Sequence, residues 1–342
     1  MQKQLNEKRG FANNPIVKAI GLQRIVVVLA VILEAVLFSI LSPAFRQYAT
    51  VVSILDYSYY ITFMAIGVTF CLISGGNDLS VGTGMICYAL AGGYLVQHMG
   101  WPVWGGMLVT IAIGLCFGVL NGAMVAIMNL PPFIATLCTM LITRGLGSII
   151  TGGMAVSWPS RKGVGGWFRS IFKIIGTGNN GLPKGTIIPI GFALVILSII
   201  IMTVVLNKTK VGRYIIAIGS NKEAARLSGV NVVKYQMMAY IISGFFAGLA
   251  GIAYAATFSS SVAPGTGAGL ELDAIGGAII GGTSMTGGQG SIIGTLLGVF
   301  VMSLLKTGLP YIGLQANWQQ IITGIVLIAA IYIDVLKNRK TA

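Results

Sequence analysis

The sequence predicts an all-α polytopic membrane protein with about ten transmembrane helices. Hydrophobic residues make up 55% of the 342 residues, and charged residues make up only 9%. Apolar stretches of about 20 residues, the length at which a helix crosses a bilayer, recur along the chain. A soluble domain of this length would carry far more charge. We therefore expect a single transmembrane domain covering residues 1–342.

The expected spans follow from apolar length and from the residues that interrupt it. Ser42-Pro43 ends the first span, Gly75-Gly76 ends the second, and a run with two prolines, residues 129–132, ends the fourth. A Gly-rich apolar stretch, 269–307, is divided at Gly287-Gly288. The ten expected spans are residues 20–42, 47–73, 80–97, 103–128, 133–152, 186–206, 236–257, the two parts of 269–307, and 317–336.

Basic residues indicate which loops face the cytoplasm, because Lys and Arg between spans stay mainly on that side. Most of them lie in the N-terminal tail and first span start, in the loop 207–235 and in the C-terminal tail. With an even number of spans, both termini and this loop are cytoplasmic, and residues 1–19 form a cytoplasmic tail. Topology and anionic membrane lipid then explain the net charge of +14 without nucleic acid.

The loop 153–185 is basic, yet the same topology places it outside the cell. Its Gly and Pro content predicts a folded extracytoplasmic segment. Four apolar side chains in it are expected at the membrane surface: Trp167, Phe168, Ile171 and Phe172.

The cytoplasmic loop 207–235 is expected to contain a short helix, Lys222 to Ser228. Asn221 can cap its start, and Gly229 supplies the left-handed residue that ends it. Such a helix suits docking to a soluble partner, with Ala225 facing that partner. A solvated loop that only sets topology explains the same residues.

Two Gly-rich interruptions look alike and fall in the two halves of the chain, Ile73–Ser80 and Ile280–Gly288. They indicate a weak internal repeat. Non-helical backbone at membrane depth is tolerated only against protein or a water-filled cavity. Both interruptions are therefore expected to break helices or make them re-entrant, and both are candidates for lining a pathway.

Ionisable residues inside apolar segments are candidates for function. Asp78 can contact a solute or cap the following helix. Arg144 lies near the middle of the fifth span and needs a partner, for which Glu34 and Asp56 are available. The helix dipole also explains the acidic start of the eighth span. The pathway candidates are Asn77, Asp78, Ser80, Arg144, Glu271, Asp273 and Thr283.

No catalytic constellation is present in the sequence. His98 is the only histidine, and the four cysteines lack the spacing of metal ligands. No G-x-x-x-x-G-K-[ST] motif occurs, so ATP is not bound here by a P-loop. We expect no metal, no cofactor and no enzymatic activity in this chain; ATP, if it drives transport, is hydrolysed on another subunit.

Four stretches resemble the permease subunits of ribose/galactose-type monosaccharide ABC importers, within the wider family that includes branched-chain amino-acid permeases. They are ISGGNDLSVG (73–82), NLPPFIATLCTMLITRGL (129–146), GRYIIAIGSNKEAARLSGVNV (212–232) and ELDAIGGAIIGGTSMTGGQGSIIGTLLG (271–298). The chain departs from the family pattern at Asn77, often apolar there; at Cys138, usually Gly; and at Lys306-Thr307, more often an uncharged residue and Asn.

The resemblance implies the transmembrane subunit of an ATP-driven sugar importer in a bacterial inner membrane, working by alternating access. It implies three partners: a cytoplasmic ATP-binding subunit, an extracytoplasmic sugar-binding protein and a second copy of the permease. It also implies a coupling helix that contacts the ATPase through Asn221, Glu223, Ala224, Ala225, Ser228 and Gly229. An ion-coupled secondary transporter and a non-transporting membrane scaffold remain as alternatives, and the sugar stays open.

Overall fold

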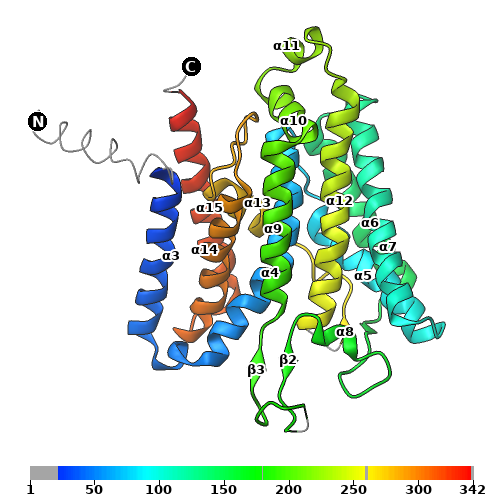
Figure 1. Cartoon of the computed structure of the whole chain (residues 1–342), viewed down its shortest axis with the longest axis vertical. Coiled ribbons are helices and arrows are strands. Elements are labelled where there is room, and N and C mark those ends of the chain that lie inside the picture. The colour runs from blue at the N-terminus through cyan, green and yellow to red at the C-terminus, as the bar shows by residue number, and fades with distance from the viewer. Residues whose placement is uncertain (1–21, 179, 259–260, 340–342) are drawn as a thin grey trace, which may run out of the picture.

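The computed structural model describes residues 22–178, 180–258 and 261–339. Its helices run along the vertical axis of Figure 1. Helices α10 (Lys210–Ser220) and α11 (Lys222–Leu227) lie at one end of the bundle, together with the start of α3 and the end of α15. The short elements of the 153–188 segment lie at the opposite end.

Long helices occupy most of the expected spans. They are α3 (Leu22–Leu41), α4 (Tyr48–Ile73), α5 (Val81–His98), α6 (Val103–Ala126), α7 (Pro132–Thr151), α9 (Gly191–Lys208), α12 (Val232–Thr257), α14 (Ile292–Tyr311) and α15 (Ala316–Arg339). The 3-10 helix η1 (Pro43–Arg46) joins α3 to α4. Among the described residues, seven helices are long and apolar enough to cross a membrane: α3, α4, α6, α7, α9, α12 and α14. The helical membrane class is thus confirmed, and the count of about ten spans is not.

The segment expected as the eighth span is only a half-length helix. α13 (Leu270–Ile280) has 11 residues, which is about 16 Å of helix, against a hydrocarbon thickness of about 30 Å. Residues 281–291 are not helical, and α14 begins at Ile292. The division at Gly287-Gly288 therefore falls inside the interruption, as expected, but the helix before it is too short for the full span that was expected there. Positive φ angles at Gly282, Gly287 and Gly288 keep this apolar stretch out of a helix.

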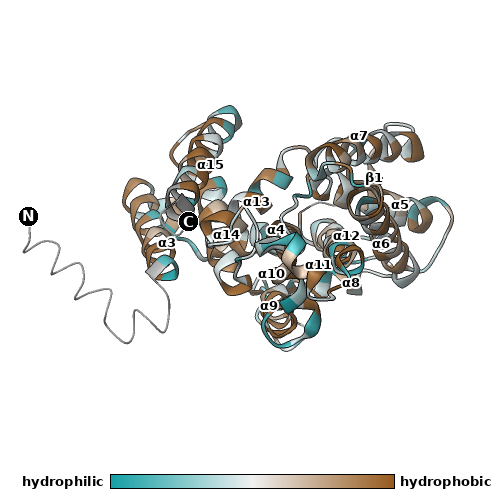
Figure 2. Ribbon diagram, turned by 90° about the horizontal axis from the view of Figure 1, so that it is seen from above, coloured by the Kyte–Doolittle hydropathy of each residue, from teal (hydrophilic) through white to brown (hydrophobic). Residues whose placement is uncertain are grey.

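α4 and α12 occupy the middle of the bundle. Seen from above, α3 and α15 lie to one side of them, and α5, α6 and α7 lie to the other (Figure 2). Glycines bring α6 and α12 into backbone contact. A Cβ added at Gly114 would lie 2.4 Å from the carbonyl oxygen of Gly244, and one at Gly118 would lie 2.6 Å from that of Tyr240. The four-residue glycine spacing therefore serves close helix packing.

The segment between α7 and α9 is folded, as the sequence predicts. It contains β1 (Val156–Ser157), α8 (Trp167–Ser170) and β2 (Ile174–Ile175), followed by β3 (Ile187–Ile188). β2 pairs antiparallel with β3, and β1 pairs antiparallel with β4 (Ser261–Val262), which precedes α13. This pairing attaches the segment to the chain that leads into the half-length helix.

Two aromatic side chains of this segment belong to the protein core. Phe168 and Phe172 are buried, and their rings lie 5.4 Å from Trp158 and 6.1 Å from Tyr59, measured between centroids. Their expected position on the membrane surface was wrong. Trp167, by contrast, is exposed.

Internal partners account for three of the basic residues in this segment. Lys173 forms an ion pair with Asp56 of α4, and Arg161 donates to the carbonyl of Lys173 at 2.6 Å. Arg169 is buried and donates to the carbonyl oxygens of Pro159 and Ala256 at 2.8 and 3.4 Å. Burial, and then the nearby charge of Arg161, lowers the pKa of Arg169, although an arginine stays protonated. These charges hold the segment to the helices.

The two ends of the bundle predict a labelling pattern. Ser220→Cys, at the end of α10, is expected to react with a membrane-impermeant maleimide only from the cytoplasm. Thr177→Cys, in the β2–β3 turn, is expected to react only from outside. Thr177 is preferred to Gly178, whose φ of 84° disfavours a side chain. The parent protein, which has four cysteines, gives the background, and labelling from the reverse side at either position contradicts the topology.

Candidate functional site

Asp78 lies in the first Gly-rich interruption, between α4 and α5, and its carboxylate accepts three hydrogen bonds. Oδ1 of Asp78 accepts from the backbone N and the Oγ of Ser80, at 3.0 and 2.6 Å. Oδ2 accepts from the Oγ of Ser243 on α12, at 2.7 Å. Asp78 is buried, so its carboxylate ties the start of α5 to α12 rather than facing open space.

The same network continues into α6 and α7. Asn121 donates to the Oγ of Ser80 at 2.9 Å, and Thr139 donates to the Oδ1 of Asn121 at 2.6 Å. Asn77 accepts from the backbone N of Asp78 at 2.9 Å. Asn77, Asp78 and Ser80 thus belong to one hydrogen-bonded network, and their contact with a solute pathway stays a prediction. Asn121 and Thr139 were missed, because an isolated polar residue in an apolar helix gives no sign of its partner.

A second polar group holds the start of α13. Both carboxylate oxygens of Glu271 accept from the backbone N of Gly269, at 3.0 and 3.1 Å. Glu271 is buried against α5, since a Cβ added at Gly82 would lie 2.3 Å from its Oε2. Glu271 therefore fixes the half-length helix against the beginning of α5.

Asp273 forms an ion pair inside the bundle. Its Oδ2 lies 3.0 Å from the Nζ of Lys306 on α14 and accepts from the hydroxyl of Tyr57 on α4 at 2.9 Å. Asp273 is fully buried, and its Oδ1 has no hydrogen-bond partner among the described residues. Lys306, where the chain departs from the family pattern, thus supplies the countercharge to Asp273.

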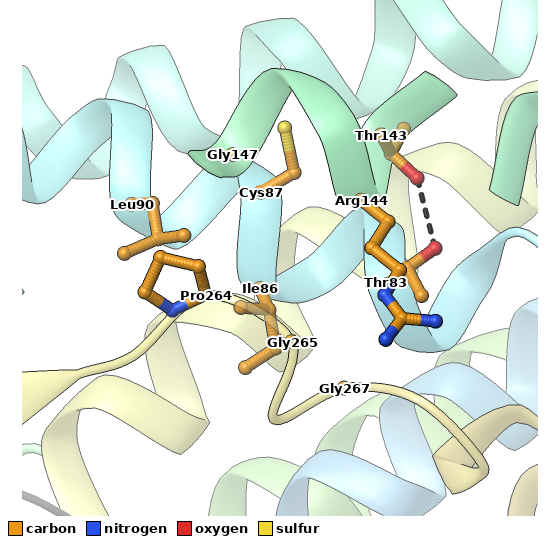
Figure 3. A pocket seen from close by; sticks show the side chains of 10 residues that line it. All are labelled: Thr83, Ile86, Cys87, Leu90, Thr143, Arg144, Gly147, Pro264, Gly265 and Gly267. Carbon is orange, nitrogen blue, oxygen red and sulfur yellow. Dashed lines mark hydrogen bonds between the residues drawn. The ribbon is translucent and has the colours of Figure 1, made fainter. Parts of the chain in front are cut away.

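Arg144 lies on an exposed face of α7. It borders the loop that precedes α13, next to Thr83 and Gly265 (Figure 3). No ion pair forms on its guanidinium within the described part of the chain. Asp56 is taken by Lys173, and Glu34 is on α3, which lies on the other side of the bundle from α7 (Figure 2). The expected pairing of Arg144 with Glu34 or Asp56 was wrong.

Thr283 belongs to the second interruption and to neither network. Its side chain is buried, and its Oγ1 has no partner among the described residues. The neighbouring Ser284 donates to the Oδ2 of Asp334 on α15 at 3.2 Å. Asp334 was not among the predicted residues. Nowhere in the described ranges do three or more His, Cys, Asp or Glu side chains gather as a metal site would require.

The short helix predicted in the loop 207–235 is present as α11, one residue shorter than expected. Oδ1 of Asn221 accepts from the backbone N of Ala224 at 2.9 Å, which caps the helix. Ser228 donates back to the carbonyl of Ala224 at 2.9 Å. Gly229 follows with a φ of 80°. Glu223 and Arg226 form an exposed pair at 2.9 Å, of a kind that adds little stability.

Ala225 does not face outward. It is buried in a small apolar cluster with Ile218 of α10 and Val232 of α12. The expectation that it faces a partner was wrong, because α11 folds back onto its neighbours through this small side chain. Leu227 is the large apolar side chain that α11 presents to its surroundings, and it is 84% exposed.

The Asp273–Lys306 pair predicts the outcome of a matched pair of variants. Lys306→Met leaves a buried carboxylate without its countercharge, which costs about 3–5 kcal/mol. We expect lower thermal stability in detergent and a lower level in the membrane. The double variant Lys306→Met/Asp273→Asn removes both charges and should regain most of that loss. Equal stability of Lys306→Met and the parent protein would contradict the pairing.

Comparison with known proteins matches most of the chain to one family. Residues 50–331 match the family described as branched-chain amino acid transport system / permease component. The ribose import permease protein RbsC of Escherichia coli K12 is 35% identical over 312 residues, which cover 90% of this chain and 92% of the relative.

Two further relatives have similar identity. The galactose/methyl galactoside import permease protein MglC of Escherichia coli K12 is 34% identical over 324 residues, 92% of this chain and 94% of the relative. RbsC of Bacillus subtilis strain 168 is 34% identical over 311 residues, 91% and 92% of the two chains. No solved structure is significantly similar. The chain therefore belongs to the family of branched-chain amino acid transport system permease components, together with these ribose and galactose import permeases.

Proposed function

We propose that this chain is the membrane-spanning subunit of an importer for a monosaccharide of the ribose/galactose class, driven by ATP that a separate cytoplasmic subunit hydrolyses. The observation that carries the proposal is 34–35% identity to ribose and galactose import permeases over nine-tenths of the chain. The absence of a P-loop motif from the sequence supports a separate ATPase. The protein resides in a bacterial inner membrane with both termini in the cytoplasm.

The ATPase docks on α11. This helix projects beyond the ends of the long helices (Figure 1), and Leu227 stands exposed on it beside the charged pair Glu223–Arg226. An exposed leucine among charged residues suits a groove on a soluble protein. The N-terminal cap at Asn221 and the left-handed Gly229 give α11 a fixed shape before docking, which lowers the entropic cost of binding.

The solute passes along the face that carries Arg144, with a second copy of the chain closing the other side. Arg144 lies 12 positions after Pro132, about 18 Å along α7, which is well inside the hydrocarbon layer. A guanidinium facing lipid there costs about 2.5–3.5 kcal/mol or more. Contact with water between two copies removes that cost. The guanidinium then offers five N–H donors to the hydroxyl groups of a passing sugar.

Other pathway candidates have supporting roles in this scheme. Asp78 accepts three hydrogen bonds and is buried, so it stabilises the backbone of the first interruption and does not contact the solute. Glu271 and Asp273 fix α13 behind the Arg144 face. The extracytoplasmic sugar-binding protein docks at the opposite end from α11, where exposed Lys162 and Lys184 attract an acidic surface.

Docking through α11 predicts the effect of Leu227→Glu. Burying a leucine contributes about 1.5–3 kcal/mol, so losing it should weaken ATPase binding roughly 10–100-fold and lower co-purification of the two subunits. Val164→Glu is the matched control, because Val164 is also exposed but belongs to the opposite end of the molecule. Unchanged co-purification with Leu227→Glu would place the ATPase contact elsewhere. Ala225→Glu is less informative, since it disrupts the packing of α11 itself.

A pathway role for Arg144 predicts at least a tenfold loss of sugar uptake in Arg144→Ala. Arg144→Lys keeps a charge with fewer donors and should lose less. Neither variant is expected to lower the amount of protein in the membrane, because Arg144 makes no ion pair among the described residues. Leu108→Ala, on an exposed face of α6, serves as the control. Normal uptake by Arg144→Ala would remove this face of α7 from the pathway.

A further inference from the structure

Three chain segments meet, backbone against backbone, next to α11. They are the end of α4 (Ile73–Gly75), the end of α10 (Gly219–Ser220) and Gly287–Gly288 of the second interruption; we call this contact the glycine junction. The backbone N of Gly288 donates to the carbonyl of Ile73 at 2.9 Å. Gly219 packs against that hydrogen bond, because a Cβ added to it would lie 1.7 Å from the oxygen of Ile73 and 2.6 Å from the nitrogen of Gly288.

The other glycines of the junction are equally constrained. A Cβ added at Gly287 would lie 2.8 Å from the carbonyl oxygen of Gly219 and 3.0 Å from the Cα of Gly75. One added at Gly288 would lie 2.5 Å from the Oγ of Ser220. Gly287 and Gly288 also have φ angles of 91° and 73°. Since no side chain separates these backbones, no rotamer change can absorb a displacement of one against another.

The junction lies where the docking helix meets both interruptions. Ser220 directly precedes Asn221, the cap of α11. Ile73 and Gly75 lead into the Asp78 network, and Gly288 leads to α14, whose start is capped by Ser291. The α10–α11 segment also borders an open pocket of about 410 Å³, which is lined by the junction residue Gly75 and by the α6–α7 connection. Backbone contacts therefore hold the segment at the junction, and the Ala225 cluster holds it against α12.

We infer that the glycine junction transmits the movement of α10–α11 to α4 and to the 281–291 segment, so that all three move as one body. The inference rests on the proposed function, because the ATPase supplies the movement. Gly219 is then a positioning residue for transport. It acts through its neighbours and touches neither the solute nor the ATPase.

The first test uses the complex of this chain with its ATPase and sugar-binding protein in vesicles. Gly219→Ala forces the junction apart, so we expect ATPase co-purification and ATP hydrolysis to persist while sugar transported per ATP falls at least tenfold. Gly324→Ala, on α15 with nothing within 4 Å of the added Cβ, should leave the ratio unchanged. An unchanged ratio in Gly219→Ala would overturn the inference. Failure of the proposed function would appear differently, as no sugar-dependent ATP hydrolysis by the parent complex.

The second test decides the matter if Gly219→Ala does not assemble. It follows hydrogen–deuterium exchange at the backbone N–H of Gly288, which donates to the carbonyl of Ile73, in the parent complex with and without ATP and sugar. Because the segments move together, we expect this hydrogen bond to persist and the exchange to stay equally slow in both conditions. Exchange at least tenfold faster during ATP hydrolysis would show that the segments separate during the cycle and would overturn the inference.

Discussion

The structure depends on how a chain embedded in lipid finds hydrogen-bond partners for the backbone N–H and C=O groups that lie outside its helices. In a bilayer, each unpaired N–H or C=O group costs several kcal/mol, and two of the stretches where this chain is not helical lie between α4 and α5 and between α13 and α14. The two interruptions solve the problem partly by pairing with each other, through the N–H of Gly288 and the carbonyl of Ile73. Side chains from other helices complete the pairing: Ser243 reaches Asp78, and Asp334 accepts from the backbone N of Met285 at 3.2 Å.

Buried carboxylates also have partners inside the protein, and most of these partners are side chains. Asp78 is held by hydroxyl and amide donors, Asp56 by Lys173, and Asp273 by Lys306 and Tyr57. Each carboxylate links elements that are distant in sequence, so the charges fix the arrangement of the helices. Arg144 differs from them, since it is exposed on α7 and forms no ion pair among the described residues. A charge at membrane depth normally faces a bundle interior or water, so its exposure supports the proposed pathway along this face.

The sequence predicted helix positions well where apolar length alone determines them. α4, α7 and α12 begin and end within a few residues of the expected spans. It failed for α13, because an apolar Gly-rich stretch has the same composition in a full span, a half-length helix and a loop. Only the backbone shows positive φ at Gly282 and Gly287. The cap at Asn221 was predictable because it is local.

Contacts between side chains that are distant in the sequence could not be predicted at the candidate site. Ser80 and Asp78 are neighbours in the chain, so their association could be expected. Lys306 and Asp273 are on different helices, and nothing in their local sequence pairs them. The same holds for Asn121, an isolated polar residue near the end of apolar α6. Ala225 was misjudged for a related reason: a small residue suits both a partner's groove and an intramolecular contact, and Ile218 occupies that contact here.

The proposed function requires that this chain moves a sugar only when a separate subunit hydrolyses ATP. The most direct measurement is uptake of radiolabelled ribose and galactose into vesicles that contain the purified chain, with and without the ATPase subunit, in the presence of the sugar-binding protein. We expect accumulation of at least one of the two sugars with ATP and the ATPase present, and none when either is omitted. Accumulation driven by a proton or sodium gradient without the ATPase would contradict it.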